Sequence, residues 1–162
     1  MKRKTALYGL MIALAFILSY LEFLFPLSVG IPGIKLGLAN LVVLLCLYRL
    51  RTRDALMISL VRILLSGLTF GSITMMLYSL CGGLVSFIAM AVCRYSGRFS
   101  VVGVSIAGGV CHNIGQIAAA AVLLSTGEIV WYLPALLIAG LMTGALLGVA
   151  ARLALPALQR MH

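Results

Sequence analysis

The feature that most limits how this chain can fold is its long stretches without charge. Between Phe99 and Ala151, a run of more than fifty residues, the only charged or histidine side chains are His112 and Glu128. Over all 162 residues, 64% are hydrophobic, 9% are charged and the mean hydropathy is +1.21. Soluble domains average about 45–50% apolar and about 25% charged residues. The sequence therefore predicts an all-α integral membrane protein, with one membrane domain over residues 1–162.

Apolar runs separated by charged or turn-rich breaks predict a bundle of six transmembrane helices. The expected spans cover residues 6–25, 34–50, 55–68, 72–93, 101–125 and 130–155. The third span is the shortest and carries Arg62, so it could instead be a tilted, broken or re-entrant segment. The basic N-terminus resembles a secretory signal, but no small-residue cleavage site follows it, and we expect an uncleaved first span.

The basic residues predict the orientation of this bundle. If alternate loops lie on the same side, ten of the twelve Lys and Arg residues share one face: Lys2, Arg3, Lys4, Arg49, Arg51, Arg53, Arg94, Arg98, Arg152 and Arg160. The positive-inside rule assigns that face to the cytoplasm, so both termini are expected inside. This orientation accounts for the net charge of +9, and the lipid bilayer rather than nucleic acid is the expected partner.

Small residues recur at helical spacing in two of the predicted spans. Gly140, Gly144 and Gly148 form a stripe in the last span, and Gly9 and Ala13 form a pair in the first. Small side chains let helix backbones approach closely in a membrane. Each set is interpreted either as packing inside the bundle or as a docking surface for another membrane subunit.

A polar cluster interrupts the fifth predicted span. At 100° per residue, His112, Asn113 and Gln116 fall on a glycine-lined side of the helix. The opposite side, expected to face lipid, carries Val110, Ile114 and Ile117. Two amides and an imidazole provide several donors and acceptors. The cluster is therefore either the wall of a binding site or a knot of hydrogen bonds between helices.

Three further charged residues are predicted at membrane depth. Arg62 needs a carboxylate, a group of carbonyls or an anionic ligand there, and Glu22 is the acid available for an ion pair. Lys35 falls in the first turn of the second span, where the helix N-terminus is already partly positive. This favours a bound anion, although Lys35 could also extend to the outer headgroups.

These residues together predict a binding site for a small carboxylate, phosphate or diphosphate. The expected lining is Lys35, Asn40, Arg62, His112, Asn113 and Gln116. Several chemistries are missing from the sequence: there is no phosphate-binding G-x-x-x-x-G-K loop, and Asp54 is the only Asp. Paired carboxylates, metal-binding His pairs and zinc-type cysteine spacings are also lacking. We therefore expect neither enzymatic activity nor a metal or cofactor.

Two motifs carry a resemblance to a known family. The segments PGIKLGLANLVVL, from Pro32, and GGVCHNIGQIAAA, from Gly108, together with six spans in a short chain, resemble the bacterial Gx transporter or heptaprenyl diphosphate synthase component I membrane family. That family is similar to the S components of energy-coupling-factor (ECF) vitamin transporters. The resemblance implies six helices, both termini inside, in the cytoplasmic membrane of a bacterium.

The two family names imply different functions. An S component binds a metabolite such as a vitamin, flavin or isoprenoid for uptake, and works with a coupling transmembrane subunit and ATPases. The resemblance implies that Gly9 and Ala13 help to dock that subunit. The synthase name implies prenyl chain elongation at Asp-rich magnesium sites, which this sequence does not contain. The alternative function is therefore a non-catalytic membrane partner in heptaprenyl diphosphate or quinone biosynthesis, or in quinone- or flavin-linked electron transfer.

Overall fold

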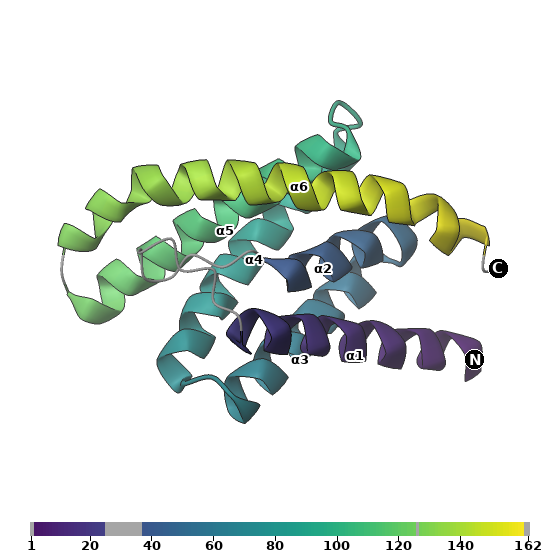
Figure 1. Ribbon diagram of the computed structural model, residues 1–162, viewed down its shortest axis with the longest axis horizontal. Helices are drawn as coiled ribbons and strands as arrows, with labels where there is room; N and C mark the ends of the chain where they lie inside the picture. The colour runs from purple at the N-terminus through teal and green to yellow at the C-terminus, as the bar shows by residue number, and fades with distance from the viewer. Residues whose placement is uncertain (1, 25–36, 126, 161–162) are drawn as a thin grey trace. The chain divides into compact units, whose positions relative to one another are not determined.

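The computed structural model describes residues 2–24, 37–125 and 127–160, and over these ranges it is all-helical (Figure 1). The elements in the described part are α1 (Lys2–Leu24), α2 (Leu38–Arg49), α3 (Thr52–Thr69), α4 (Ile73–Tyr95), α5 (Val101–Leu124), the 3-10 helix η1 (Glu128–Tyr132) and α6 (Leu133–Arg160). The all-α prediction is confirmed. The chain divides into two compact units, residues 1–76 (unit 1) and residues 77–162 (unit 2).

Four helices are long and apolar enough to cross a bilayer. They are α1 over Thr5–Leu24, α4, α5, and η1 with α6 over Glu128–Leu158. Helix α2 has 12 residues, or about 18 Å at 1.5 Å per residue, against a hydrocarbon core of about 30 Å. Helix α3 is continuous over 18 residues but carries three charged side chains. The multi-pass membrane character is supported, whereas the count of six spans remains a prediction.

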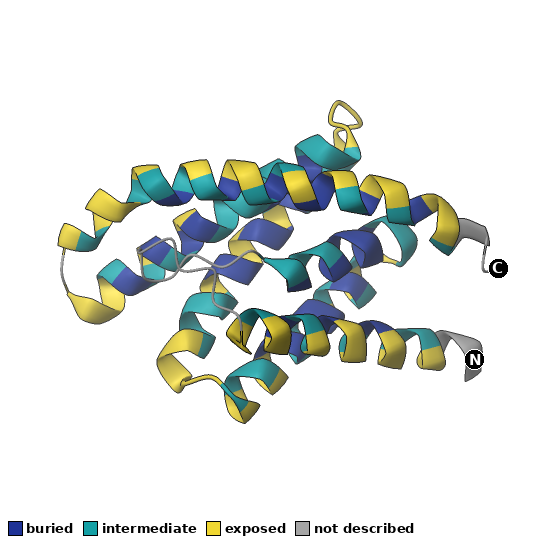
Figure 2. Cartoon of the chain, in the orientation of Figure 1, coloured by how far each residue is buried: buried dark blue, intermediate teal, exposed yellow. Residues whose placement is uncertain are grey.

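Unit 1 is built around α2. Every residue from 42 to 47 is buried, and Figure 2 shows this helix mostly in dark blue. A helix that is apolar all round has to be covered on every side. Within unit 1, α2 packs against both α1 and α3, which also pack against each other.

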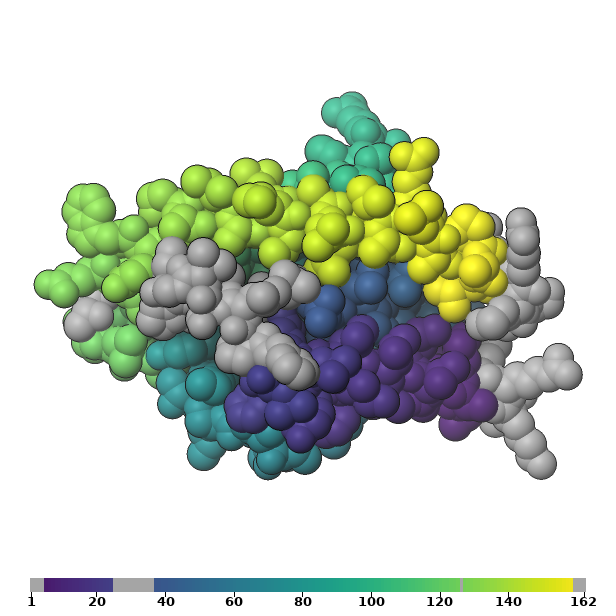
Figure 3. Space-filling model, in the orientation of Figure 1, coloured from purple at the N-terminus to yellow at the C-terminus, as the bar shows by residue number. Residues whose placement is uncertain are grey.

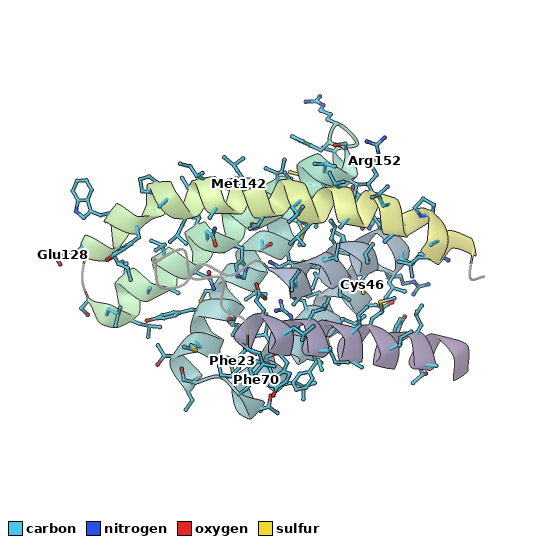
Figure 4. The ribbon with its side chains drawn as sticks, in the orientation of Figure 1. Phe23, Cys46, Phe70, Glu128, Met142 and Arg152 are labelled. Atoms are coloured by element: carbon cyan, nitrogen blue, oxygen red, sulfur yellow. The ribbon has the colours of Figure 1, made fainter. Side chains whose placement is uncertain are left out.

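Helices α1 and α3 are parallel and are tied together at both ends. Near their N-termini, the Tyr8 hydroxyl donates a hydrogen bond of 2.7 Å to Asp54 Oδ2. Asp54 lies in the first turn of α3, where the helix dipole favours an acidic side chain. At the other end, three rings of α1 surround the Phe70 ring at centroid distances of 5.2–5.5 Å: Phe16, Tyr20 and Phe23 (Figure 4). These contacts hold α1 beside α3 along its length.

Unit 2 contains an antiparallel pair, α5 and α6, whose backbones touch. An added Cβ on Gly144 would lie 2.8 Å from the Ile106 Cα atom, and one on Gly148 would lie 2.7 Å from the Val102 Cα atom. A Cβ on Gly140 would lie 2.9 Å from the Gly109 carbonyl oxygen. The glycine stripe of the last helix is therefore used for packing against α5, inside the unit.

Helix α4 covers a second side of α5. A Cβ on Gly115 would lie 2.9 Å from the Gly82 Cα atom of α4. Ile114 is 41% exposed, as expected, but Ile117 is buried at 9%. The prediction that Ile117 faces lipid is wrong. Ile117 lies one turn after Asn113, on the side that α6 covers.

Each unit carries basic residues at one end. In unit 1, Arg49, Arg51 and Arg53 flank the turn between α2 and α3. In unit 2, Arg152 lies towards the end of the α5–α6 pair that is opposite Glu128, and Figure 4 labels both residues. This distribution agrees with the charge asymmetry of the sequence. Helices α1 and α6, which are both visible in Figure 3, carry large exposed apolar side chains, such as Leu10 at 58% and Met142 at 69% exposure.

Candidate functional site

The predicted site residues fall into two clusters, one in each unit. Asn40 and Arg62 lie in unit 1, whereas His112, Asn113 and Gln116 lie in unit 2. Lys35 lies outside the described residues. The two clusters are described separately below, because they differ in how their polar groups are satisfied.

In unit 2, Asn113 joins α5 to α6. Its Nδ2 atom donates a hydrogen bond of 2.6 Å to the Leu136 carbonyl oxygen, and the side chain is 8% exposed. A Cβ on Gly140 would lie 2.9 Å from the same Nδ2 atom. The amide therefore fits into space that glycine leaves on α6. A hydrogen bond between two helices is what the packing interpretation predicts for this cluster.

His112 and Gln116 lie on a different side of α5, towards α4. A Cβ on Gly82 would lie 2.7 Å from the Gln116 Cγ atom and 3.2 Å from the His112 Cε1 atom. Asn113 is about 100° further round the helix than His112. The structure thus divides the three polar residues between two neighbouring helices, because α5 is packed on both sides.

In unit 1, Arg62 is the centre of a second polar cluster. The side chain extends from α3 and is 9% exposed. Its Nη2 atom donates to Asn40 Oδ1 at 3.3 Å, longer than the usual 2.9–3.0 Å of such bonds. Within the described part of the chain, the buried Arg62 Nε atom has no hydrogen-bond partner. The guanidinium therefore retains the capacity to bind an acceptor.

One turn further along α3, the side chain of Ser66 has a similar property. Its Oγ atom is buried and, over the ranges that the structure covers, has no hydrogen-bond partner. Residues four apart lie on the same side of a helix. Arg62 and Ser66 thus present two unsatisfied buried donors on one side of α3.

Glu22 supplies the negative charge of this cluster. Its Oε1 atom accepts a hydrogen bond from the Gly37 backbone N–H, and its charge interacts favourably with Arg62. Gly37 has φ 74° and ψ 28°, a left-handed conformation that suits glycine, and it directly precedes α2. The predicted ion pair of Glu22 and Arg62 stays a prediction, while the carboxylate binds the start of α2.

The role of Gly37 was missed by sequence reasoning, although a signal was available. A glycine directly before an apolar helical run marks a helix terminus, and Gly37 directly precedes α2. Nothing local indicates that the acceptor for the Gly37 N–H comes from α1. We name Glu22, Gly37, Asn40, Arg62 and Ser66 the Arg62 cluster.

The Arg62 cluster is suited to holding an anion. It combines a guanidinium, a hydroxyl and the N-terminus of α2, and a helix N-terminus carries a partial positive charge. Arginine matches the oxygen spacing of carboxylates and phosphates. The polar atoms of the unit 2 cluster, in contrast, are placed between closely packed helices.

The comparison with known families agrees with the resemblance found in the sequence. The family model described as heptaprenyl diphosphate synthase component I matches residues 11–154. The chain belongs to this family. The matched range contains both polar clusters. No curated protein and no solved structure matches the chain, and the similarity to S components of ECF transporters remains a prediction.

Proposed function

We propose that the chain is a non-catalytic membrane subunit that binds an anionic, amphipathic metabolite through the Arg62 cluster. The observation that carries this proposal is the burial of Arg62. An arginine at membrane depth costs about 2.5–3.5 kcal/mol on insertion scales. Among the residues described, Arg62 donates one long hydrogen bond to a neutral amide oxygen. Glu22 interacts both with Arg62 and with the start of α2. An anionic ligand would complete the neutralisation.

Isoprenoid diphosphates are the ligand class that we favour. Their diphosphate group would satisfy the donors of the Arg62 cluster, and their hydrocarbon tail suits a protein with exposed apolar helix surfaces. The family description, which names heptaprenyl diphosphate, supports the same class. The chain itself has only three acidic residues, so it lacks the paired carboxylates that bind magnesium during prenyl elongation. This supports a binding role rather than catalysis.

The test is ligand binding by the purified chain in detergent. We expect farnesyl diphosphate to bind at least about tenfold more tightly than farnesol, which has the same tail but no charge. Arg62→Gln should lower the affinity for farnesyl diphosphate at least about tenfold, because the charge-assisted hydrogen bonds are lost. Binding is measured by isothermal titration calorimetry.

Gln116→Ala is the matched control, since it removes a polar side chain from the other cluster. It should leave the affinity unchanged. Equal binding of farnesol and farnesyl diphosphate, or full affinity in a folded Arg62→Gln variant, would contradict the proposed function.

A surface on α1 supports assembly with a second membrane protein. Gly9 and Ala13 are exposed, and, apart from the neighbouring backbone of α1, no atom of the described residues lies within 4 Å of a Cβ placed on Gly9. Such a surface lets another helix approach closely. The partner would be an ECF-type coupling subunit with its ATPases if the function is uptake, or a membrane protein of isoprenoid, quinone or redox metabolism if the chain is an accessory subunit. Native co-purification distinguishes these two roles.

We further propose that both termini lie in the cytoplasm of a bacterium, with six crossings of its cytoplasmic membrane. The basic end of each unit supports this orientation, because positive loops are retained inside. In this orientation, the Arg62 cluster lies in the outer part of unit 1, since α2 begins and α3 ends on that side.

A further inference from the structure

We propose that Glu22 is a built-in competitor for the ligand of the Arg62 cluster, and that an incoming diphosphate displaces its carboxylate from the start of α2. This inference rests on the proposed function and adds to it a mechanism that sets the affinity. The site is then never empty of negative charge: either Glu22 or the ligand holds the helix terminus.

The first observation is where Glu22 binds. Its carboxylate reaches from α1 to the Gly37 N–H, and Gly37, as a glycine, has no side chain that could cap α2 itself. Free amides and a partial positive charge make a helix N-terminus a ready position for phosphate. Glu22 therefore occupies the position that a phosphate group would take.

The second observation is independent of the helix terminus. Arg62 is buried, its Nε atom has no partner in the described ranges, and its Nη2 atom bonds to Asn40 in the first turn of α2. The guanidinium is thus directed to the same end of α2 from the neighbouring helix. Donors from α2 and α3 converge there, and α1 contributes the single acidic group.

Displacement is favourable because the two anions differ in charge and in acceptor number. A carboxylate carries one negative charge on two oxygens, whereas a diphosphate carries more charge on more oxygens, and can bind the helix terminus and the guanidinium together. Glu22 is half-buried, so its released carboxylate would still have access to solvent or headgroups. The cost of releasing it lowers the apparent affinity of the ligand.

The experiment compares two glutamate variants in farnesyl diphosphate binding. Glu22→Gln keeps the size of the side chain and removes its charge, so the affinity should rise about tenfold relative to the unmodified chain. Glu128→Gln is the control, because Glu128 is the other glutamate of the chain and lies exposed in η1 of unit 2. It should leave the affinity unchanged.

The outcomes separate this inference from the proposed function. If the unmodified chain binds farnesyl diphosphate and Glu22→Gln binds it equally or more weakly, the competitor role is wrong and the binding function stands. If neither the unmodified chain nor folded Glu22→Gln binds, both proposals are overturned.

A second measurement covers the case in which Glu22→Gln does not fold. The unmodified chain is labelled with a membrane-permeant carbodiimide, and the three acidic residues are quantified by mass spectrometry. Adding farnesyl diphosphate should increase labelling of Glu22 severalfold, because its carboxylate has left the Gly37 N–H, while Asp54 and Glu128 stay constant. Unchanged or reduced labelling of Glu22 at saturating ligand would overturn the inference.

Discussion

The two polar clusters of this chain differ in how their polar groups are satisfied. In unit 2, the Asn113 amide bonds to a backbone carbonyl at 2.6 Å, between helices that approach at glycines. In unit 1, the Arg62 guanidinium bonds to one neutral amide at 3.3 Å and keeps a buried N–H without a partner in the part described. Both clusters look equally like binding sites in the sequence. Only the second combines a guanidinium with a carboxylate.

The difference shows what close helix packing can and cannot satisfy. Glycine lets a neighbouring backbone come near enough to accept a hydrogen bond from an amide, so a neutral group can be completed within the bundle. A guanidinium has five donors and a full charge, and a few backbone contacts do not offset its desolvation. Buried neutral residues in such a bundle therefore indicate packing, whereas a buried and partly satisfied charge indicates a ligand.

The same substitution in both clusters should have opposite effects, and this is the largest effect expected. Asn113→Asp removes the donor to Leu136 and places a carboxylate beside that carbonyl, so the free energy of unfolding should fall by about 3 kcal/mol. Asn40→Asp gives Arg62 a charged acceptor, which should raise stability by about 1 kcal/mol and weaken farnesyl diphosphate binding. Chemical denaturation in mixed micelles measures both. Destabilisation of similar size at the two positions would remove the distinction between the clusters.

The next effect concerns the glycine contacts of unit 2. Gly144→Ala places a methyl group 2.8 Å from the Ile106 Cα atom and 3.0 Å from the Ser105 carbonyl oxygen. The helices must separate, which should cost about 1–3 kcal/mol in unfolding free energy. Gly9→Ala is the control, because its methyl group meets open space, and it should be neutral or slightly stabilising. A tolerated Gly144→Ala would mean that α5 and α6 are less tightly packed than the structure shows.

The smallest expected effect tests whether the free hydroxyl of Ser66 serves a ligand. Ser66→Ala removes a buried donor that has no partner among the described residues, so the stability of the unliganded protein should change by less than about 0.5 kcal/mol. Farnesyl diphosphate affinity should fall severalfold. Ser19→Ala is the control: the Ser19 hydroxyl already donates to the Ala15 carbonyl oxygen, so ligand affinity should not change. Unaltered affinity in Ser66→Ala would place the ligand away from this part of α3.

Much of the secondary structure could be predicted from the sequence. The fifth span was expected at residues 101–125 and α5 covers Val101–Leu124, while the second was expected at 34–50 and α2 covers Leu38–Arg49. Apolar runs and the breaks between them are local signals, and a helix in lipid satisfies its own backbone hydrogen bonds. The side of a helix that faces lipid is less certain, as Ile117 shows, because it depends on how many neighbours the helix has.

The site was predicted in part, for the same physical reason. The sequence alone determined that the chain is a helical membrane protein and that Arg62 needs a carboxylate, a group of carbonyls or an anionic ligand, since the cost of burying a charge belongs to the residue itself. It could not decide which polar residues become neighbours. The tertiary structure paired Asn113 with Leu136, Arg62 with Asn40, and Glu22 with Gly37. Those pairings depend on how helices far apart in sequence pack, and for Asn113 and Leu136 that packing includes the close approach that Gly140 allows.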